Sequence, residues 1–342
     1  PVGELPSTTQ ITLVSPTSPT PDDDSFLVHL TVDPAQTGDN QLTVRLSTWT
    51  GQPLESDPAP RVTLSFTSLS HGTEEGGVLL TETPEGWTTS GLKLSLNGWW
   101  QVAATVQRAG EQNATATFML LLPDPNTQGF DAPASPGSDP AAQALFHQAL
   151  DQMTGWTSLR WTELIGSGLD VLVIGDFAVI EPANGGTGAY SMDLLFSGSF
   201  APTSSGGAAA APTFDSRSSV VVGEQGWMRT TSGAWLEEPP VRYVPPSGWS
   251  STYAGATDFQ FGAPQVVDGV EYQILLFHLP EQNTAEAWFV WWIDPTTGDI
   301  MRINMISRMH YMTWLYRDIN EDLIIEPPPG QDTTPETATP AP

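Results

Sequence analysis

The segments near the carboxyl end that are apolar at nearly every position limit most strongly what this chain can fold into. In residues 287–293, AWFVWWI, large apolar side chains fill both alternating sets of positions. Residues 274–279, ILLFHL, follow the same pattern except at His278. Successive side chains of a strand point to opposite faces of its sheet, and an antiparallel sheet with one face in water alternates polar with apolar residues. We therefore expect both faces of this sheet to be covered.

One predicted helix is available to cover one of these faces. Asp139 is suited to cap it, with Pro140 in its first turn and Gly155 at its end. Its apolar residues recur at helical spacing, at Ala142, Leu145, Phe146, Ala149, Leu150 and Met153. A helix of about 15 residues spans about 22 Å, which is too short to cover a flat nine-stranded sheet. A curved sheet that wraps the helix resolves this and leaves an apolar hollow, which is a natural ligand site.

The second half of the chain is accordingly predicted to be an α+β half-barrel, a curved antiparallel sheet wrapped around a helix, over residues 141–328. Its strands are expected at 157–165, 169–180, 189–200, 218–230, 257–262, 270–279, 286–293, 299–313 and 323–326. The low-complexity insert at 201–213 is interpreted as a solvated loop between two of these strands.

The first half of the chain alternates apolar and polar side chains in seven or eight short segments separated by turn residues, over residues 25–122. This spacing predicts an all-β immunoglobulin-like sandwich. The flanking segments are too polar and too rich in proline to bury a core. We expect a disordered leader at 1–24 with one short strand at 11–14, a solvated Pro-rich linker at 123–140 and a disordered tail at 329–342.

The residues expected to line the hollow come mainly from the strand predicted at 299–313. Methionine is flexible and polarisable and suits irregular apolar shapes, and Met301, Ile303, Met305, Met309 and Tyr311 are expected to share one face of this strand. The predicted ligand-binding residues are Met301, Ile303, Met305, Met309, Trp292, Leu275, Phe277, Leu194 and Phe196. Two alternatives stay open: the methionines fill gaps in a packed core, or they hold a soft metal together with His310.

Composition and motifs exclude several function classes. Asp and Glu total 39 against 11 Lys and Arg, a formal charge of −28, whereas binding to nucleic acid needs a basic surface. The chain has no Cys, which excludes thiolate nucleophiles, iron–sulfur clusters and Cys-type zinc sites. No G-x-S-x-G, H-E-x-x-H or P-loop motif is present, and Glu163, Asp170, Asp176 and Glu181 are interpreted as strand-edge and turn residues. We therefore predict a protein that is not an enzyme and uses no cofactor.

Several phrases in the second unit resemble a known family. They are GSGLDVLVIGDFAVIEP, VVVGEQGWMRTTSGAWLEEP, YQILLFHLP and WFVWWIDPTTGDIMRINM. Residues 141–329 resemble the LolA/LolB and mycobacterial LppX-type lipoprotein-carrier superfamily, in which an unclosed β-barrel wraps a helix and holds acyl chains. The resemblance implies binding of a lipid or another hydrophobic molecule.

The first unit resembles a different family. Its phrases LTVRLSTWTGQPLESDPAPRVTLSFTSLSHG and GWTTSGLKLSLNGWWQVAATVQRAG are similar to CopC/YtkA-like immunoglobulin-type domains of exported copper-handling proteins. This resemblance implies an alternative function, the extracytoplasmic portion of a CopC/CopD-like copper-transport or resistance protein. Copper needs at least three converging soft or imidazole ligands. The weak candidates are His71, His310 and Met312, and no metal site is predicted from them.

The predicted function is therefore non-catalytic binding of a lipid acyl chain or other hydrophobic molecule by an exported or cell-surface bacterial protein. A second alternative is an adhesion or carbohydrate-binding module, which requires exposed tryptophans at Trp87, Trp99 and Trp100; we expect one of Trp99 and Trp100 in the core and its neighbour outside. The expected location is extracytoplasmic, at the cell surface or in the periplasm. Because the sequence starts at Pro1, we expect a preceding segment to anchor the full-length protein to a membrane.

Overall fold

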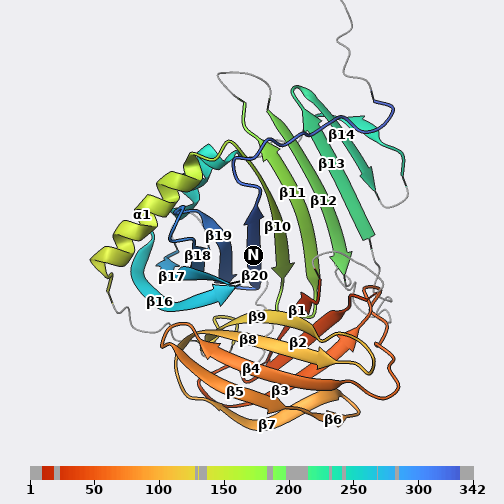
Figure 1. The fold of residues 1–342 in the computed structure, drawn as a ribbon, viewed down its shortest axis with the longest axis vertical. Helices are drawn as coiled ribbons and strands as arrows, with labels where there is room; N and C mark the ends of the chain where they lie inside the picture. The colour runs from red at the N-terminus through yellow and green to blue at the C-terminus, as the bar shows by residue number, and fades with distance from the viewer. Residues whose placement is uncertain are drawn as a thin grey trace, which may run out of the picture.

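A computed structural model describes residues 10–18, 24–127, 130, 137–182, 188–197, 215–230, 233–240, 244–267, 269–281 and 285–331. In this part of the chain the strands form three sheets, of five, four and eleven strands. The two smaller sheets come from the first third of the chain, and the large sheet bends around one long helix (Figure 1). The insert predicted at 201–213 lies outside the described residues.

The two smaller sheets face each other across one apolar core. Their strands are β1 (Ile11–Pro16), β2 (Leu27–Asp33), β3 (Gly38–Ser47), β4 (Arg61–Ser68), β5 (Thr73–Leu79), β6 (Thr81–Thr83), β7 (Gly86–Leu94), β8 (Gly98–Gln107) and β9 (Ala114–Leu122). They pair antiparallel in the orders β1-β2-β3-β7-β6 and β5-β4-β8-β9. The alternating residues Val28, Leu30 and Val32 are fully buried between the sheets. The assignment of this sandwich to the immunoglobulin type stays a prediction.

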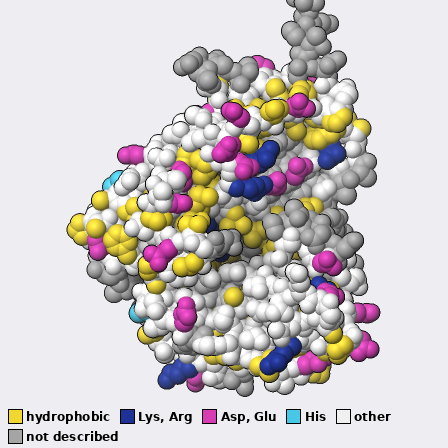
Figure 2. All heavy atoms as spheres, viewed as in Figure 1, with side chains coloured by type: hydrophobic (Ala, Val, Ile, Leu, Met, Phe, Trp, Pro, Cys, Tyr) yellow, Lys and Arg dark blue, Asp and Glu magenta, His cyan; other side chains and the backbone are white. Residues whose placement is uncertain are grey.

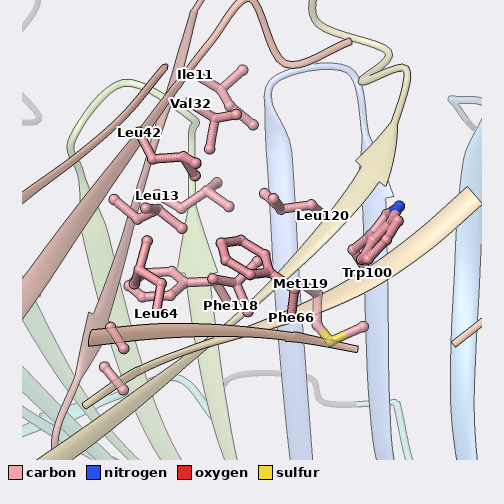
Figure 3. Close-up of a cluster of buried hydrophobic side chains, with 14 of the residues drawn as sticks. Ile11, Leu13, Val32, Leu42, Leu64, Phe66, Trp100, Phe118, Met119 and Leu120 are labelled. Atoms are coloured by element: carbon pink, nitrogen blue, oxygen red, sulfur yellow. The ribbon is translucent and has the colours of Figure 1, made fainter. Parts of the chain in front are cut away.

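Strand β1 lies in the segment predicted as a disordered leader and corrects that prediction for the described residues 10–18. It pairs with β2 from Ile11↔Val32 to Pro16↔Leu27. Ile11 and Leu13 point into the sandwich core beside Val32 and Leu42 (Figure 3). The short strand expected at 11–14 is therefore present, and it supplies apolar side chains that the sandwich needs for its core.

The helix α1 (Pro140–Thr154) forms as the sequence predicts. The Asp139 carboxylate accepts hydrogen bonds from the backbone N–H groups of Ala141 (2.7 Å) and Ala142 (3.2 Å), which satisfies two of the unpaired donors of the first turn. Gly155 closes the helix with a hydrogen bond to the carbonyl of Gln152. The buried side of the helix consists of Ala142, Phe146, Ala149 and Met153.

The large sheet contains β10 (Ser158–Gly166), β11 (Leu172–Ile180), β12 (Ala189–Ser197), β13 (Asp215–Val222), β14 (Gln225–Thr230), β15 (Leu236–Glu238), β16 (Thr257–Val267), β17 (Val270–Leu279), β18 (Ala287–Ile293), β19 (Ile300–Ser307) and β20 (His310–Arg317). Its order is β15-β14-β13-β12-β11-β10-β20-β19-β18-β17-β16, with antiparallel pairing between neighbours. A 3₁₀ helix, η2 (Pro246–Tyr253), precedes β16. The first strand of the unit therefore lies beside the last one, in the middle of the sheet.

Two of the predicted strands are wrong because each is a hairpin. The segment 218–230 divides into β13 and β14, and the segment 299–313 divides between β19 and β20. The second turn places Met309 at a φ of 56°, so Met309 belongs to neither strand and does not share a face with Met305. The strand predicted at 323–326 is also wrong, since those residues form no ladder.

The two apolar faces of strands β17 and β18 pack against different parts of the protein. On the inner face, toward α1, Phe146 stacks on Trp291 at a centroid distance of 5.1 Å. On the outer face, Ile274, Val290 and Trp292 belong to the same buried cluster as the sandwich core. The prediction that both faces are covered is confirmed, but the outer cover is the sandwich, which leaves a hollow of only about 60 Å³ beside Asn304 and Ile306.

The segment after β9 is part of this contact between the two units and not a solvated linker. Asp124 is completely buried, and its carboxylate accepts hydrogen bonds from the Tyr311 hydroxyl (2.8 Å) and the Asn126 backbone N–H (2.8 Å). The Asn126 amide donates in turn to the Tyr311 oxygen at 2.7 Å. Burial raises the pKa of Asp124 to about 6, although these hydrogen bonds act in the opposite direction. The linker prediction is therefore wrong for the described residues 123–127.

Candidate ligand-binding site

A cavity of about 350 Å³ lies between η2 and the inner face of the large sheet. The described residues that line it are Trp161, Glu163, Phe177, Tyr190, Val244, Trp249, Thr252, Tyr253, Trp314 and Tyr316. Seven of these ten residues are aromatic and one is a carboxylic acid. We call these seven rings and Glu163 the aromatic cage.

The strand register brings the cage together from distant parts of the chain. Trp161 lies opposite Phe177 on one neighbouring strand and opposite Tyr316 on the other. Glu163 lies opposite Trp314. Because side chains two residues apart on a strand share a face, Trp161 and Glu163 of β10 point to the same side as Trp314 and Tyr316 of β20. The helix η2 closes this side with Trp249, Thr252 and Tyr253.

The rings of the cage hold one another in place. Trp161 stacks on Phe177 at 4.8 Å and an interplanar angle of 7°, and Trp249 meets Trp161 edge-on at 5.7 Å. The Trp249 indole N–H donates to the backbone oxygen of Val244 at 2.7 Å. Gly175, opposite Glu163 on β11, leaves room for the Phe177 ring, because a Cβ at that position would overlap the ring. The rings of the cage are therefore packed against one another and against the sheet.

Glu163 is an acid in an apolar setting. Burial raises the pKa of its carboxyl to about 7, and hydrogen bonds from the side chains of Trp161 and Trp314 offset this only in part. The pKa values of the Tyr190 and Tyr253 hydroxyls are raised above 10, first by their own burial and then by the charge of Glu163. In the described part of the chain, no Lys, Arg or His contributes to the pKa of Glu163. Its charge is therefore uncompensated by any basic side chain in that part.

The interpretation of Glu163 as a strand-edge or turn residue is therefore wrong. Glu163 lies in the middle of β10, which has neighbours on both sides. The sequence contained one indication of a buried Glu163. It alternates with Trp161 and Ile165, so it occupies a position on the apolar face of its strand. The cage rings gave no comparable signal, since aromatic residues at alternating positions are common in any packed core.

None of the nine predicted ligand-binding residues is among the residues that line the cage. Leu275, Phe277 and Ile303 are buried in the inner core under α1. Leu194 and Met305 are partly buried against the same core. These five residues therefore share the inner face with the cage.

The other predicted ligand-binding residues have different surroundings. Trp292 faces the sandwich, with the Arg302 guanidinium 4.7 Å from its ring centroid. Met309 lies in the turn after β19, and Met301 is half-buried near the start of that strand. Phe196 pairs with Val173 on β11. Contact of any of the nine residues with a ligand stays a prediction.

The metal and carbohydrate candidates are distributed as follows. His71 follows β4 in the sandwich, whereas His310 and Met312 lie on β20. Among the described residues, no three His, Cys, Asp or Glu side chains are grouped as metal ligands would be.

Trp99 and Trp100 are both buried, with 4% and 0% exposure. As neighbours on β8 they point to opposite faces of their sheet, so only one of them faces the interior of the sandwich. The other is nevertheless not exposed, because both belong to the buried cluster that also contains Ile274 and Trp292 of the large sheet.

A second cavity, of about 340 Å³, lies where the sandwich meets the turn between β10 and β11. The Ser47 hydroxyl lies 2.7 Å from Nε2 of His29, whose Nδ1 contacts Asp170, in the order of a catalytic triad. Asp170 is also bound by Arg45 at 2.7 Å. Burial raises the pKa of Asp170, but the contacts with His29 and Arg45 outweigh burial and hold it below the usual range.

The backbone N–H that follows Ser47 is already engaged in another hydrogen bond. A nucleophilic serine needs N–H donors directed at the developing oxyanion. The backbone N–H of Thr48, the residue after the serine, already donates to the carbonyl of Gln52 at 2.8 Å. We interpret the network as an ion pair that joins the turn at Asp170 to the sandwich sheet.

Comparison with known proteins gave matches only among solved structures. No family model and no curated protein sequence matches the chain. The chain is similar to LprF from Mycobacterium bovis, with 12% identity and a TM-score of 0.44 over 56% of this chain and 99% of that one. It is similar to the Mycobacterium tuberculosis lipoprotein LppX, with 16% identity and a TM-score of 0.37 over 55% and 100% of the two chains. For a LolA superfamily protein from Nitrosomonas europaea, the identity is 10% and the TM-score 0.22 over 54% and 94%.

The CopC/YtkA resemblance of residues 25–122 stays a prediction. No helix in the described ranges combines the length and the apolar character that crossing a membrane requires.

Proposed function

We propose that this protein binds a lipid or another hydrophobic molecule, without catalysing a reaction, in the cavity between η2 and the inner face of the large sheet. The observation that carries this proposal is the aromatic cage. Its volume of about 350 Å³ falls in the range of about 300–1,000 Å³ that is usual for small-molecule sites.

The chemistry of the lining favours an apolar ligand. A ligand that displaces water from aromatic surface gains about 25 cal/mol for each Å² of apolar area buried. The same face continues past the cage to Leu194 and Met305. Leu194 lies level with Glu163, two strands away, and Met305 lies one position beyond Trp314 along the same face. These two predicted ligand-binding residues extend the cage into an apolar surface along which a chain-like ligand lies.

The place of action belongs to the same proposal. We place the protein outside the cytoplasm, at the cell surface or in the periplasm, in the role of a carrier or sensor of its ligand.

Binding of the apolar dye N-phenyl-1-naphthylamine tests this proposal. Thr252 lines the cavity from η2, whereas Ser250, two residues away on the same helix, is exposed and does not line it. We expect Thr252→Trp to fill the cavity mouth and weaken dye binding about tenfold or more, whereas Ser250→Trp leaves binding unchanged.

Mass spectrometry of lipids extracted from the purified protein provides the second readout. Wild-type protein and Ser250→Trp are expected to carry the same apolar molecule, and Thr252→Trp to have lost it. Equal dye binding by the two variants would place the hydrophobic site elsewhere and defeat the proposal.

A further inference from the structure

The aromatic cage contains one group that an apolar ligand does not explain. Glu163 is directed into a space walled by aromatic rings and has no basic partner in the described part of the chain. Withdrawing a carboxylate from water is costly unless a counter-charge or several donors accompany it. A site for a purely hydrocarbon chain would be better served by Gln, Met or Leu at this position.

The rings and the carboxylate have matching preferences. The faces of Trp and Tyr carry negative electrostatic potential and attract a cation placed within about 6 Å of the ring centre. The carboxylate of Glu163 adds a full negative charge at the same place, and this charge reaches the hydroxyls of Tyr190, Tyr253 and Tyr316. Both kinds of group are satisfied together by a positive charge inside the cage.

The lining also indicates which kind of cation fits. Calcium takes six to eight oxygen ligands, and magnesium retains water in an octahedral shell. The described lining offers one carboxylate, one threonine hydroxyl and aromatic rings, so it is a poor substitute for the hydration shell of a hard metal ion. An ammonium with alkyl substituents is weakly hydrated and presents methyl or methylene groups to the rings.

We propose that the aromatic cage holds an organic cation, an alkylated or quaternary ammonium group, with Glu163 as its counter-charge and Trp161, Trp249 and Trp314 among its walls. This inference rests on the proposed ligand site and specifies its ligand as an amphiphile whose positively charged end occupies the cage. The overall charge assists the encounter, because acidic side chains are spread over both units and Lys and Arg are few on the face shown in Figure 2.

Choline and its uncharged isostere 3,3-dimethylbutan-1-ol provide the test, because they differ in charge and hardly in shape. By calorimetry at pH 8, we expect the wild-type protein to bind choline about tenfold or more tightly than the isostere. Glu163→Gln should reduce this preference several-fold, to the part that the rings supply. Glu237→Gln, which removes an exposed carboxylate on β15, is the matched control and should retain it.

A pH titration of the wild-type protein keeps the test independent of how the variant folds. Glu163 must be ionised to pair with the cation, and Tyr190, Tyr253 and Tyr316, the other titratable groups that face it, stay neutral because their pKa values are raised. With the pKa of Glu163 at about 7, choline affinity should fall about tenfold between pH 8 and pH 6. The affinity for the isostere should not change.

The outcomes separate this inference from the proposed function. Equal affinity for choline and the isostere in the wild-type protein overturns the cation inference, and continued dye binding then leaves the hydrophobic site standing. A choline preference without dye binding has the opposite meaning: the cage is a cation site, and the proposal of a hydrophobic ligand falls. Loss of the choline preference in Glu237→Gln would show that net charge alone attracts the cation, and would also overturn the inference.

Discussion

The cost of keeping Glu163 in the cage should be visible in how stability depends on pH. Below its ordinary pKa of 4.5, this carboxyl is protonated in both the folded and the unfolded chain. As the pH rises from 4.5 to about 7, the unfolded chain ionises while the folded chain keeps the proton. The unfolded state is favoured increasingly over this interval, so the stability present below pH 4.5 is lost as the pH approaches and passes 7.

The magnitude follows from the two pKa values. A pKa raised from 4.5 to about 7 corresponds to about 3 kcal/mol less stability at pH 8 than at pH 4, since each pH unit is worth about 1.4 kcal/mol. Glu163→Gln removes the titrating group and hence this loss. The difference in unfolding free energy between Glu163→Gln and the wild-type protein should therefore grow in favour of the variant by about 3 kcal/mol between pH 4 and pH 8.

Urea denaturation followed by tryptophan fluorescence, at intervals of pH from 4 to 8, measures this difference. The control is Glu237→Gln, whose exposed side chain should change stability by no more than about 0.5 kcal/mol at any pH. A difference between Glu163→Gln and the wild-type protein that stays constant over the range would refute the reasoning, because it would mean that Glu163 is as well solvated in the folded state as in the unfolded one.

Three further predictions concern the packing around the site. Tyr311→Phe removes a donor to the buried Asp124 carboxylate and should destabilise the protein by about 2 kcal/mol at pH 8 and by less at pH 5, below the pKa of about 6 of Asp124, in urea denaturation. Trp292→Ala opens a cavity between the large sheet and the sandwich and should cost about 3–5 kcal/mol by thermal denaturation; a cost below about 1 kcal/mol would contradict the shared core. Asp139→Ala removes the cap of α1 and should cost about 1 kcal/mol, whereas Asp139→Asn should restore most of it in the same assay.

The parts of the fold that depend on neighbouring residues were predictable from the sequence. The cap at Asp139, the apolar spacing up to Met153 and the stop at Gly155 define α1 within a few residues. The strands that are apolar on both faces correctly indicated that both faces of the sheet are buried. The turn at Met309 was missed because a two-residue hairpin turn without glycine barely interrupts the alternation of side chains.

The cage was missed for a different reason. Glu163 and Trp314 are neighbours only because β10, the first strand of the large sheet in the sequence, pairs with β20, the last. Pairing between strands so far apart in the chain leaves no trace in the local pattern of either one. The methionines near 305 are soft and apolar, but the hollow that Met305 lines has only about 60 Å³, whereas the cavity of about 350 Å³ lies beside tryptophan and tyrosine.

The shared core of the sheet and the sandwich also determines how a guest enters. The outer face of the sheet is fastened to a second folded unit, so its curvature is braced from behind and the barrel wall cannot flatten to widen the hollow. The helix η2 belongs to no strand ladder, and its Ser247 N–H donates to the Glu181 carboxylate at 2.8 Å. For the proposed ligand we therefore expect entry into the cavity to depend on movement of η2, which covers one side of it.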